Sequence, residues 1–197
     1  LVASVLPDID IVARIAGPFA YFRYHRGPTH AILGLIVLSA LLAAAVGRFY
    51  PAAGKKKLFL WALLGTTVHV GLDLLTSYST FLLWPFSDRP FFTGILRFSD
   101  RTGWYLLGGA SALGLLASRL RRFALKPAWF GLAALLLYGG YIGGRAWVRY
   151  ELRSALATHY AETAGGGILV SSRTSGISDW NFVVDGPGEY ITGTVSY

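Results

Sequence analysis

Four long apolar blocks dominate the pattern of hydrophobic and polar positions along the chain. They cover residues 31–47, 58–72, 104–118 and 128–144, and none of them contains Asp, Glu, Lys or Arg. At 1.5 Å per residue each block forms a helix of roughly 22–26 Å, near the length that crosses a bilayer core. A soluble protein of this size has too much surface to bury four such helices. The pattern therefore predicts about four transmembrane helices, and the alternative is a soluble protein with long buried helices.

The pattern changes near the C-terminus. Residues 168–171, 180–184 and 190–197 read as short strands, and Asp185-Gly186-Pro187-Gly188 is a hairpin turn signal. The predicted fold is an all-α polytopic membrane protein with a small C-terminal β appendage. Residues 1–150 would form the helical membrane domain, and residues 151–197 a juxtamembrane segment and a partial β domain. Because the chain lacks methionine and a lone hairpin is marginally stable, we expect it to be a piece of a longer protein.

Composition and charge narrow the function classes. Hydrophobic residues make up 54% of the chain and charged residues 14%, and the absence of cysteine excludes disulfides and thiolate metal sites. The net charge of +8 comes largely from two clusters between the apolar blocks. Their members are Arg48, Lys55, Lys56 and Lys57, then Arg119, Arg121, Arg122 and Lys126. No basic run alternates with aromatic residues, so we expect no nucleic-acid partner.

The basic clusters also predict an orientation. Both fall on the same side of a four-helix weave, which the positive-inside rule places in the cytoplasm. Residues 1–30, the loop 78–103 and the chain after about 148 would then be extracytoplasmic. The predicted location is the cytoplasmic (inner) membrane of a bacterium or archaeon, with several passes through the bilayer.

Two acidic residues open the polar pattern. Asp8 and Asp10 stand two positions apart, and in an extended segment their carboxylates project to one face. Hard metal ions favour such a pair, although taken alone the pair is better explained by a solvated turn.

A second polar cluster, His25-Arg26-Gly27-Pro28-Thr29-His30, precedes the first apolar block. Gly27-Pro28 predicts a turn and Thr29 a helix N-cap, which places His30 in the first helical turn. A helix N-terminus favours an anion such as phosphate, and Arg26 is suited to bind one. The alternative is a polar cap at the membrane interface.

A third pair, His69 and Asp73, lies within and just beyond the second apolar block. Residues four apart share one helical face, and both side chains reach a single ion. A carboxylate within a membrane is costly and therefore suggests function. The predicted topology brings all three clusters to one membrane face. The proposed metal ligands are Asp8, Asp10, His25, His30, His69 and Asp73, and this mixed set suits one or two ions of zinc or manganese.

At these residues the sequence resembles the YdjM/YbcI-type membrane proteins, a group of predicted metal-dependent hydrolases. Leu6-Pro7-Asp8-Ile9-Asp10, then His25-Arg26-Gly27-Pro28-Thr29-His30, then His69-x3-Asp73-x2-Thr76 carry the resemblance. It implies a divalent-metal site on the six acidic and histidine residues named above. Members of the group carry a Thr-His pair ahead of these motifs, so we expect one further ligand outside the present sequence.

The leading hypothesis is a membrane-bound metal-dependent hydrolase that acts on a phosphoester or other ester of an amphiphilic substrate. Arg26 and His30 are the predicted catalytic residues, and Arg26 with the helix start would hold the developing anion. The aromatic loop 78–105 would admit the substrate from the bilayer. The alternatives are a metal or proton transporter, and a non-catalytic membrane binding protein stabilised by metal. The third and fourth apolar blocks contain no acid or histidine, which disfavours a transporter.

Overall fold

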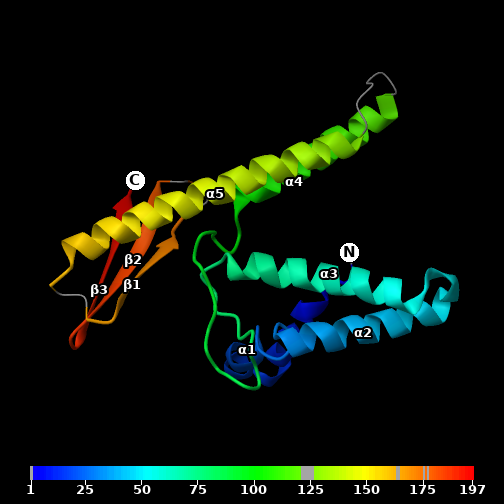
Figure 1. Ribbon diagram of the computed structural model, residues 1–197, viewed down its shortest axis with the longest axis horizontal. Coiled ribbons are helices and arrows are strands. Elements are labelled where there is room, and N and C mark those ends of the chain that lie inside the picture. The colour runs from blue at the N-terminus through cyan, green and yellow to red at the C-terminus, as the bar shows by residue number, and fades with distance from the viewer. Residues whose placement is uncertain (1, 121–126, 163–164, 175, 177) are drawn as a thin grey trace. The chain divides into compact units, whose positions relative to one another are not determined.

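A computed structural model describes residues 2–120, 127–162, 165–174, 176 and 178–197 (Figure 1). The predicted basic residues Arg121, Arg122 and Lys126 lie outside the described residues. The chain divides into two compact units, Leu1–Thr93 and Gly94–Tyr197. The domain boundary expected at residue 150 falls within one continuous helix, α5 (Pro127–His159).

The first unit is a helical hairpin with a folded N-terminal segment. A 3-10 helix η1 (Leu6–Ala16) and helix α1 (Pro18–Tyr24) precede the long helices α2 (Ile32–Phe49) and α3 (Lys55–Leu74). The short 3-10 helix η2 (Pro51–Ala53) joins α2 to α3, which lie side by side (Figure 1). Ser39 and Thr66 are fully buried between them, and their hydroxyls hydrogen-bond at 3.2 Å. The hairpin thus satisfies its internal polar groups, as an apolar surrounding requires.

Two glycines allow the N-terminal segment to reach this hairpin. A Cβ at Gly65 of α3 would lie 2.8 Å from the Cβ of Ala3, so the chain start packs closely on α3. A Cβ at Gly34 of α2 would overlap the carbonyl oxygen of Pro28. The turn that carries His25 and His30 therefore packs closely over the start of α2.

Among the described residues, two helices are long and apolar enough to cross a membrane, α2 and α3. In their most apolar windows, 22% and 17% of the residues are buried. The core helix of a soluble protein is mostly buried, so both helices direct most of their apolar surface outward.

The prediction of about four transmembrane helices is wrong for the described residues. Helix α4 (Arg101–Leu120) and helix α5 cover the third and fourth apolar blocks, but neither reaches the apolar content of a span. Glycine, serine, tyrosine and tryptophan interrupt their aliphatic residues, which makes transfer of these helices into hydrocarbon less favourable. The second half of α5 instead packs against a β-sheet.

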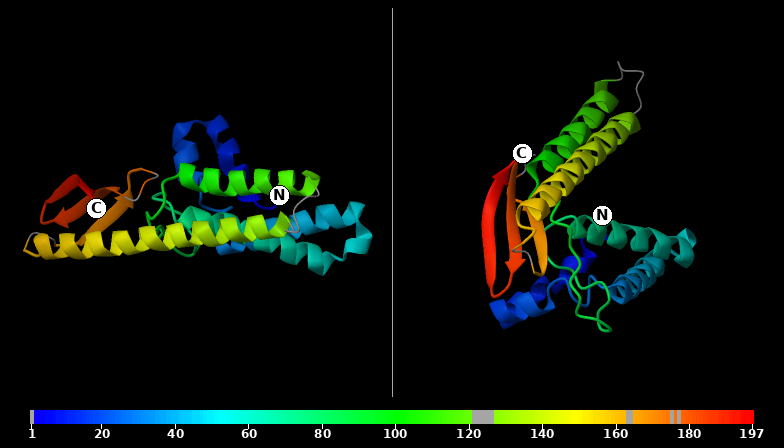
Figure 2. Two further views of the ribbon diagram at one scale, coloured as in Figure 1. Left: turned by 90° about the horizontal axis from the view of Figure 1, so that it is seen from above. Right: turned by 60° about the vertical axis from the view of Figure 1, so that its left-hand side comes forward.

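The second unit combines a helix pair with that sheet. Helices α4 and α5 lie side by side (Figure 2). Strands β1 (Gly167–Ser172), β2 (Asp179–Gly186) and β3 (Glu189–Ser196) form an antiparallel sheet in the order β1-β2-β3. The three predicted strands are thus confirmed. The fold contains a three-stranded antiparallel sheet as well as helices, so it is not all-α.

The predicted hairpin turn is also confirmed. Gly186 pairs with Glu189, which leaves Pro187 and Gly188 as the two turn residues. Gly188 has a φ of 84°, a conformation that glycine adopts without strain and that follows proline in a type II turn. The turn lies one residue later than the predicted Asp185–Gly188, and its two central residues set the register of β2 against β3.

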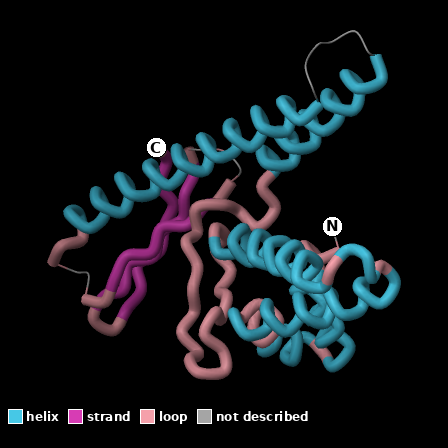
Figure 3. The backbone as a smooth tube through the Cα atoms, turned by 45° about the vertical axis from the view of Figure 1, so that its right-hand side comes forward, coloured by secondary structure: helices cyan, strands magenta, loops and turns pink. Residues whose placement is uncertain are grey.

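The core of the second unit lies between α5 and the sheet (Figure 3). Val148 and Leu152 of α5 pack against Val170 of β1 and Trp180 of β2. The fully buried Arg145 lies above this core, with its guanidinium 4.7 Å from the Trp180 ring and its Nε donating to the carbonyl of Ile95 at 2.7 Å. An arginine inside α5 therefore serves packing in this unit.

Candidate metal centre

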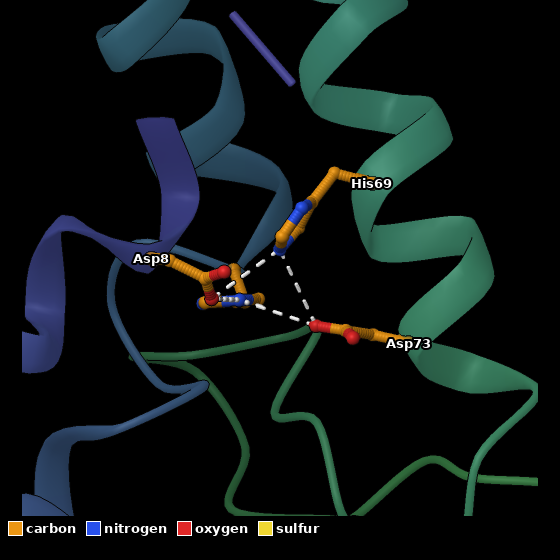
Figure 4. A group of neighbouring side chains, drawn as sticks. Asp8, His69 and Asp73 are labelled. Atoms are coloured by element: carbon orange, nitrogen blue, oxygen red, sulfur yellow. Dashed lines mark ion pairs between the residues drawn. The ribbon is translucent and has the colours of Figure 1, made fainter. Parts of the chain in front are cut away.

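Three segments far apart in the sequence bring acidic and histidine side chains together in the first unit. Helix η1 supplies Asp8, the turn before α2 supplies His30, and the end of α3 supplies His69 and Asp73. Figure 4 shows that Asp8 points from its helix toward His69 and Asp73 on α3. One ligand atom from each of the four residues lies within 4.8 Å of the others.

The four distances between a histidine nitrogen and a carboxylate oxygen in this cluster lie in a narrow range. His30 Nε2 lies 3.5 Å from Asp8 Oδ1 and 3.3 Å from Asp73 Oδ2. His69 Nε2 lies 3.4 Å from Asp8 Oδ1 and 3.5 Å from Asp73 Oδ2. Ligands about 2.0–2.1 Å from one tetrahedral ion are about 3.3–3.4 Å apart, so the observed spacing fits a divalent cation.

Burial makes this arrangement unusual without a ligand. His30 is fully buried, and the side chains of His69 and Asp73 are only 16% and 15% exposed. Within the described part of the chain, His30 Nε2, His69 Nε2 and Asp73 Oδ2 are buried without a hydrogen-bond partner. Leaving a buried polar atom unsatisfied costs about 1–3 kcal/mol, so three converging ones indicate a site built for a bound group.

The cluster is open on one side. The Asp8 side chain is 44% exposed, whereas the other three members are nearly enclosed. A catalytic metal site needs an approach for water and substrate, and zinc sites can expand from four to five ligands. Access to this centre is therefore past Asp8.

Asp10 and His25 lie beside the four-residue cluster. With Asp8 they form a second group whose ligand atoms are within 4.8 Å of one another. Both oxygens of Asp10 are already engaged, because Oδ1 contacts His25 Nδ1 at 2.9 Å and Oδ2 accepts from the Arg26 backbone N–H at 2.9 Å. The Thr29 hydroxyl also donates to Oδ2, at 2.8 Å.

These contacts suit Asp10 for orienting His30. Asp10 Oδ2 lies 3.4 Å from His30 Nδ1, and Thr29 Oγ1 lies 3.0 Å from the same nitrogen. A metal-binding histidine usually has its second ring nitrogen held by a carboxylate or another acceptor, which directs the free nitrogen to the ion. His30 has this arrangement, with Nε2 facing the cluster.

Arg26 is the basic residue nearest the cluster. Its side chain is 3% exposed, and its guanidinium donates to Asp73 Oδ1 at 2.8 Å and to Thr76 Oγ1 at 3.2 Å. Its backbone has a φ of 61°, which is uncommon outside glycine, and its carbonyl accepts from the Phe81 N–H at 3.0 Å. Arg26 thus holds one oxygen of Asp73 and leaves the other facing the histidines.

The electrostatics follow from these contacts. The imidazoles of His30 and His69, whose Nε2 atoms lie 3.5 and 3.4 Å from Asp8 Oδ1, hold the pKa of Asp8 well below its usual range despite partial burial. Burial opposes ionisation of Asp10, but its hydrogen bonds from His25, His30, Arg26 and Thr29 outweigh burial and lower its pKa. Burial likewise disfavours the His30 imidazolium, yet Asp10, Asp73 and Asp8 together raise its pKa to about 10. In the metal-free protein, a proton on His30 therefore occupies the charge position that a cation would take.

Two local predictions at this site are wrong. Residues 6–16 form a 3-10 helix and are not extended. Asp8 reaches His69 and Asp10 reaches His25, while the two carboxylates contact opposite nitrogens of His30. Thr29 does not cap α2, because that helix begins at Ile32 after Ala31, and the Thr29 hydroxyl binds Asp10. Long-range partners override the local preference in both cases.

The structure places every predicted site residue in or beside the cluster and adds two that the sequence analysis missed. Thr29 was interpreted as a helix cap, and Thr76 was named only within the motif that carries the family resemblance. Both are hydroxyl partners of charged cluster residues. Thr29 lies between Arg26 and His30 in the motif, and this position could have indicated a role in the site. The interpretation as a helix cap gave a different role to the same residue.

The fold and the cluster together define a class of protein. The first unit is a hairpin of two helices with spanning length, bearing a buried Asp/His group that suits a divalent cation. The chain belongs to the YdjM inner membrane protein family, and the match covers residues 1–148. This family match confirms the resemblance in the sequence and agrees with an inner-membrane location.

A curated relative shares part of the chain. The uncharacterized protein YfhP of Bacillus subtilis (strain 168) is 36% identical over 100 residues, which is 51% of this chain and 31% of that protein. The chain thus spans less than a third of the length of this relative. No solved structure matches the chain.

Proposed function

We propose that the chain forms the metal-binding part of a membrane-bound hydrolase that acts on an ester, with a phosphoester preferred. The observation that carries the proposal is the cluster of Asp8, His30, His69 and Asp73. Each histidine Nε2 in it lies 3.3–3.5 Å from both carboxylates, and three of the four ligand atoms are buried without a hydrogen-bond partner. Oxygen and nitrogen donors together suit zinc or manganese. The ion would be held by Asp8, His30, His69 and Asp73.

A divalent cation in this site would supply a water activated for hydrolysis near neutral pH. The protein's own contribution is orientation, because Arg26 fixes Asp73 and Asp10 fixes His30. His25 has its Nδ1 against Asp10 and is partly exposed, which is the arrangement of a general base held by a carboxylate. The predicted contact of Arg26 with a substrate anion would need the guanidinium to share its bond to Asp73.

The membrane placement belongs to the same proposal. Lys55, Lys56 and Lys57 begin α3, and Asp73 lies roughly 27 Å further along that helix. If the basic end faces the cytoplasm, the cluster lies at the opposite, extracytoplasmic interface of a multi-pass protein. An amphiphilic substrate would reach it from the bilayer surface.

Metal analysis with a substrate panel tests the proposal. The purified protein is loaded with Zn²⁺ or Mn²⁺ and compared with His69→Ala, Asp73→Ala and the control Asp88→Ala, which changes an exposed aspartate outside the cluster. We expect bound metal and ester turnover in the wild type and in the control, and loss of both in the two cluster variants. Metal content unaffected by Asp73→Ala would refute the ligand set.

A structural metal is the second candidate, because four protein ligands are typical of closed structural sites. It predicts that removing the metal lowers the melting temperature while no ester is turned over by the loaded wild type. That outcome would refute the hydrolase and retain the metal centre.

A further inference from the structure

An apolar hollow lies next to the candidate metal centre. It has a volume of about 570 Å³ and is lined by Val2, Val5, Leu6, Asp8 and Ile9. Its volume is within the roughly 300–1,000 Å³ of small-molecule sites, but it is a shallow depression that is open over most of its extent. The hollow is formed by the N-terminal segment. The sequence had instead suggested the aromatic loop 78–105 as the place where substrate enters.

The described lining of the hollow is aliphatic except for Asp8. Val2, Val5 and Ile9 are 67%, 64% and 51% exposed, so their aliphatic side chains present an open apolar surface. Asp8 is the one ionisable residue in the lining, and its Oδ1 lies 3.5 Å from His30 Nε2 and 3.4 Å from His69 Nε2. The hollow and the metal centre therefore meet at Asp8, on the side from which the centre is accessible.

We propose that this hollow binds the aliphatic chain of the ester substrate, with the ester group beside Asp8. The inference rests on the proposed hydrolase function and names its substrate class: a single-chain amphiphile with a short polar head. The lining offers no side-chain donor for a sugar or a peptide, and an alkyl chain needs none. In a protein of an inner-membrane family, such a chain reaches the hollow directly from the lipid phase.

Chain length is the quantity that tests this inference. We would measure kcat/KM of the metal-loaded protein with p-nitrophenyl alkyl phosphodiesters from ethyl to octyl, below their micelle concentrations. Each buried methylene raises kcat/KM by up to about fourfold, so the plot of log kcat/KM against chain length should rise and then level off as the hollow fills.

Two matched variants separate the hollow from general membrane effects. Val5→Asn places a polar amide in the lining, at the residue that precedes η1. Val12→Asn makes the same change within η1, at a 60% exposed residue outside the lining. We expect Val5→Asn to flatten the chain-length dependence, so that kcat/KM for the octyl ester falls toward that for the ethyl ester. We expect Val12→Asn to match the wild type. Turnover independent of chain length, or equal flattening in both variants, would overturn the inference.

A binding measurement distinguishes its failure from that of the proposed function. Ethyl and octyl phosphate are titrated into the metal-loaded proteins by calorimetry. Tighter binding of octyl phosphate that Val5→Asn abolishes supports the hollow even if the protein hydrolyses no ester, in which case only the proposed function fails. Equal affinity for the two phosphates would overturn the alkyl site whatever the turnover shows.

Discussion

Replacing Asp10 with asparagine tests how the six acidic and histidine residues divide their work. Asp10 is 8% exposed and receives short contacts from the Arg26 backbone N–H, the Thr29 hydroxyl and His25 Nδ1, at 2.8–2.9 Å. In Asp10→Asn, an amide NH₂ at the position of Oδ2 would face the Arg26 N–H and the Thr29 hydroxyl, both donors to Asp10, so the NH₂ must face His25 Nδ1 instead. The charge that holds His30 Nδ1 is also lost, so the imidazole is less firmly directed at the cluster.

The expected cost is moderate because no direct ligand is removed. Loss of a residue that orients a metal ligand typically lowers metal affinity about 10–100-fold, which is about 1.4–2.7 kcal/mol. Solvent screens this effect little at a buried carboxylate. We therefore expect Asp10→Asn to bind the same number of ions as the wild type, with a Kd about 10–100 times higher.

Calorimetric titration of the metal-free protein with Zn²⁺, in competition with a chelator of known affinity, gives both the Kd and the number of ions. Asp73→Asn removes a proposed ligand and should lose affinity by a larger factor, whereas Asp88→Asn, at an exposed residue outside the cluster, should match the wild type. If Asp10→Asn lowers the number of ions from two to one, Asp10 is itself a ligand in the Asp8, Asp10 and His25 group. An affinity within about twofold of the wild type would refute any role in orienting His30.

Three further predictions concern pH, the Arg26 contact and the second unit. Because its neighbours raise the pKa of His30 to about 10, its imidazolium stabilises the metal-free fold fully below about pH 6.5, and this stability is lost as the pH rises through about 10. Zn²⁺ binding at neutral pH must then displace this proton, so calorimetry in buffers of different ionisation enthalpy should detect at least one proton released per ion; zero release would contradict the assignment of His30. Arg26→Lys removes the fork that joins Asp73 to Thr76, and we expect metal affinity to fall about tenfold or more while the helix content measured by circular dichroism is kept; unchanged affinity would show that Asp73 needs no support. Trp180→Ala removes a fully buried ring from the core between α5 and the sheet, and should destabilise the second unit by about 3–5 kcal/mol in denaturant unfolding. Metal affinity should not change, because all proposed ligands lie in the first unit, and a matching loss of metal binding would contradict that ligand set.

Helix faces, the hairpin turn and the apolar segments follow from residues that are close in sequence, so they could be predicted without the fold. The four-residue spacing of His69 and Asp73 placed both side chains on one face of α3, because a helix repeats every 3.6 residues. Pro187 and Gly188 fixed the β2–β3 hairpin, because the backbone angles of these two residues favour that turn. The long aliphatic blocks likewise identified α2 and α3, since hydropathy depends on composition alone.

The contacts among the cluster side chains, and the role of each, depend on the tertiary fold. Asp8 and His69 are brought together by the packing of the chain start against Gly65, a contact that no local pattern encodes. Arg26 faces Asp73, and Thr29 binds Asp10 in place of capping a helix. Leaving a buried carboxylate without partners costs more free energy than losing a helix cap. The fourth apolar block illustrates the same limit, since α5 continues past it to pack on a sheet formed later in the chain. Local periodicity fixes the face on which a residue lies, but the partner of that face depends on segments distant in sequence.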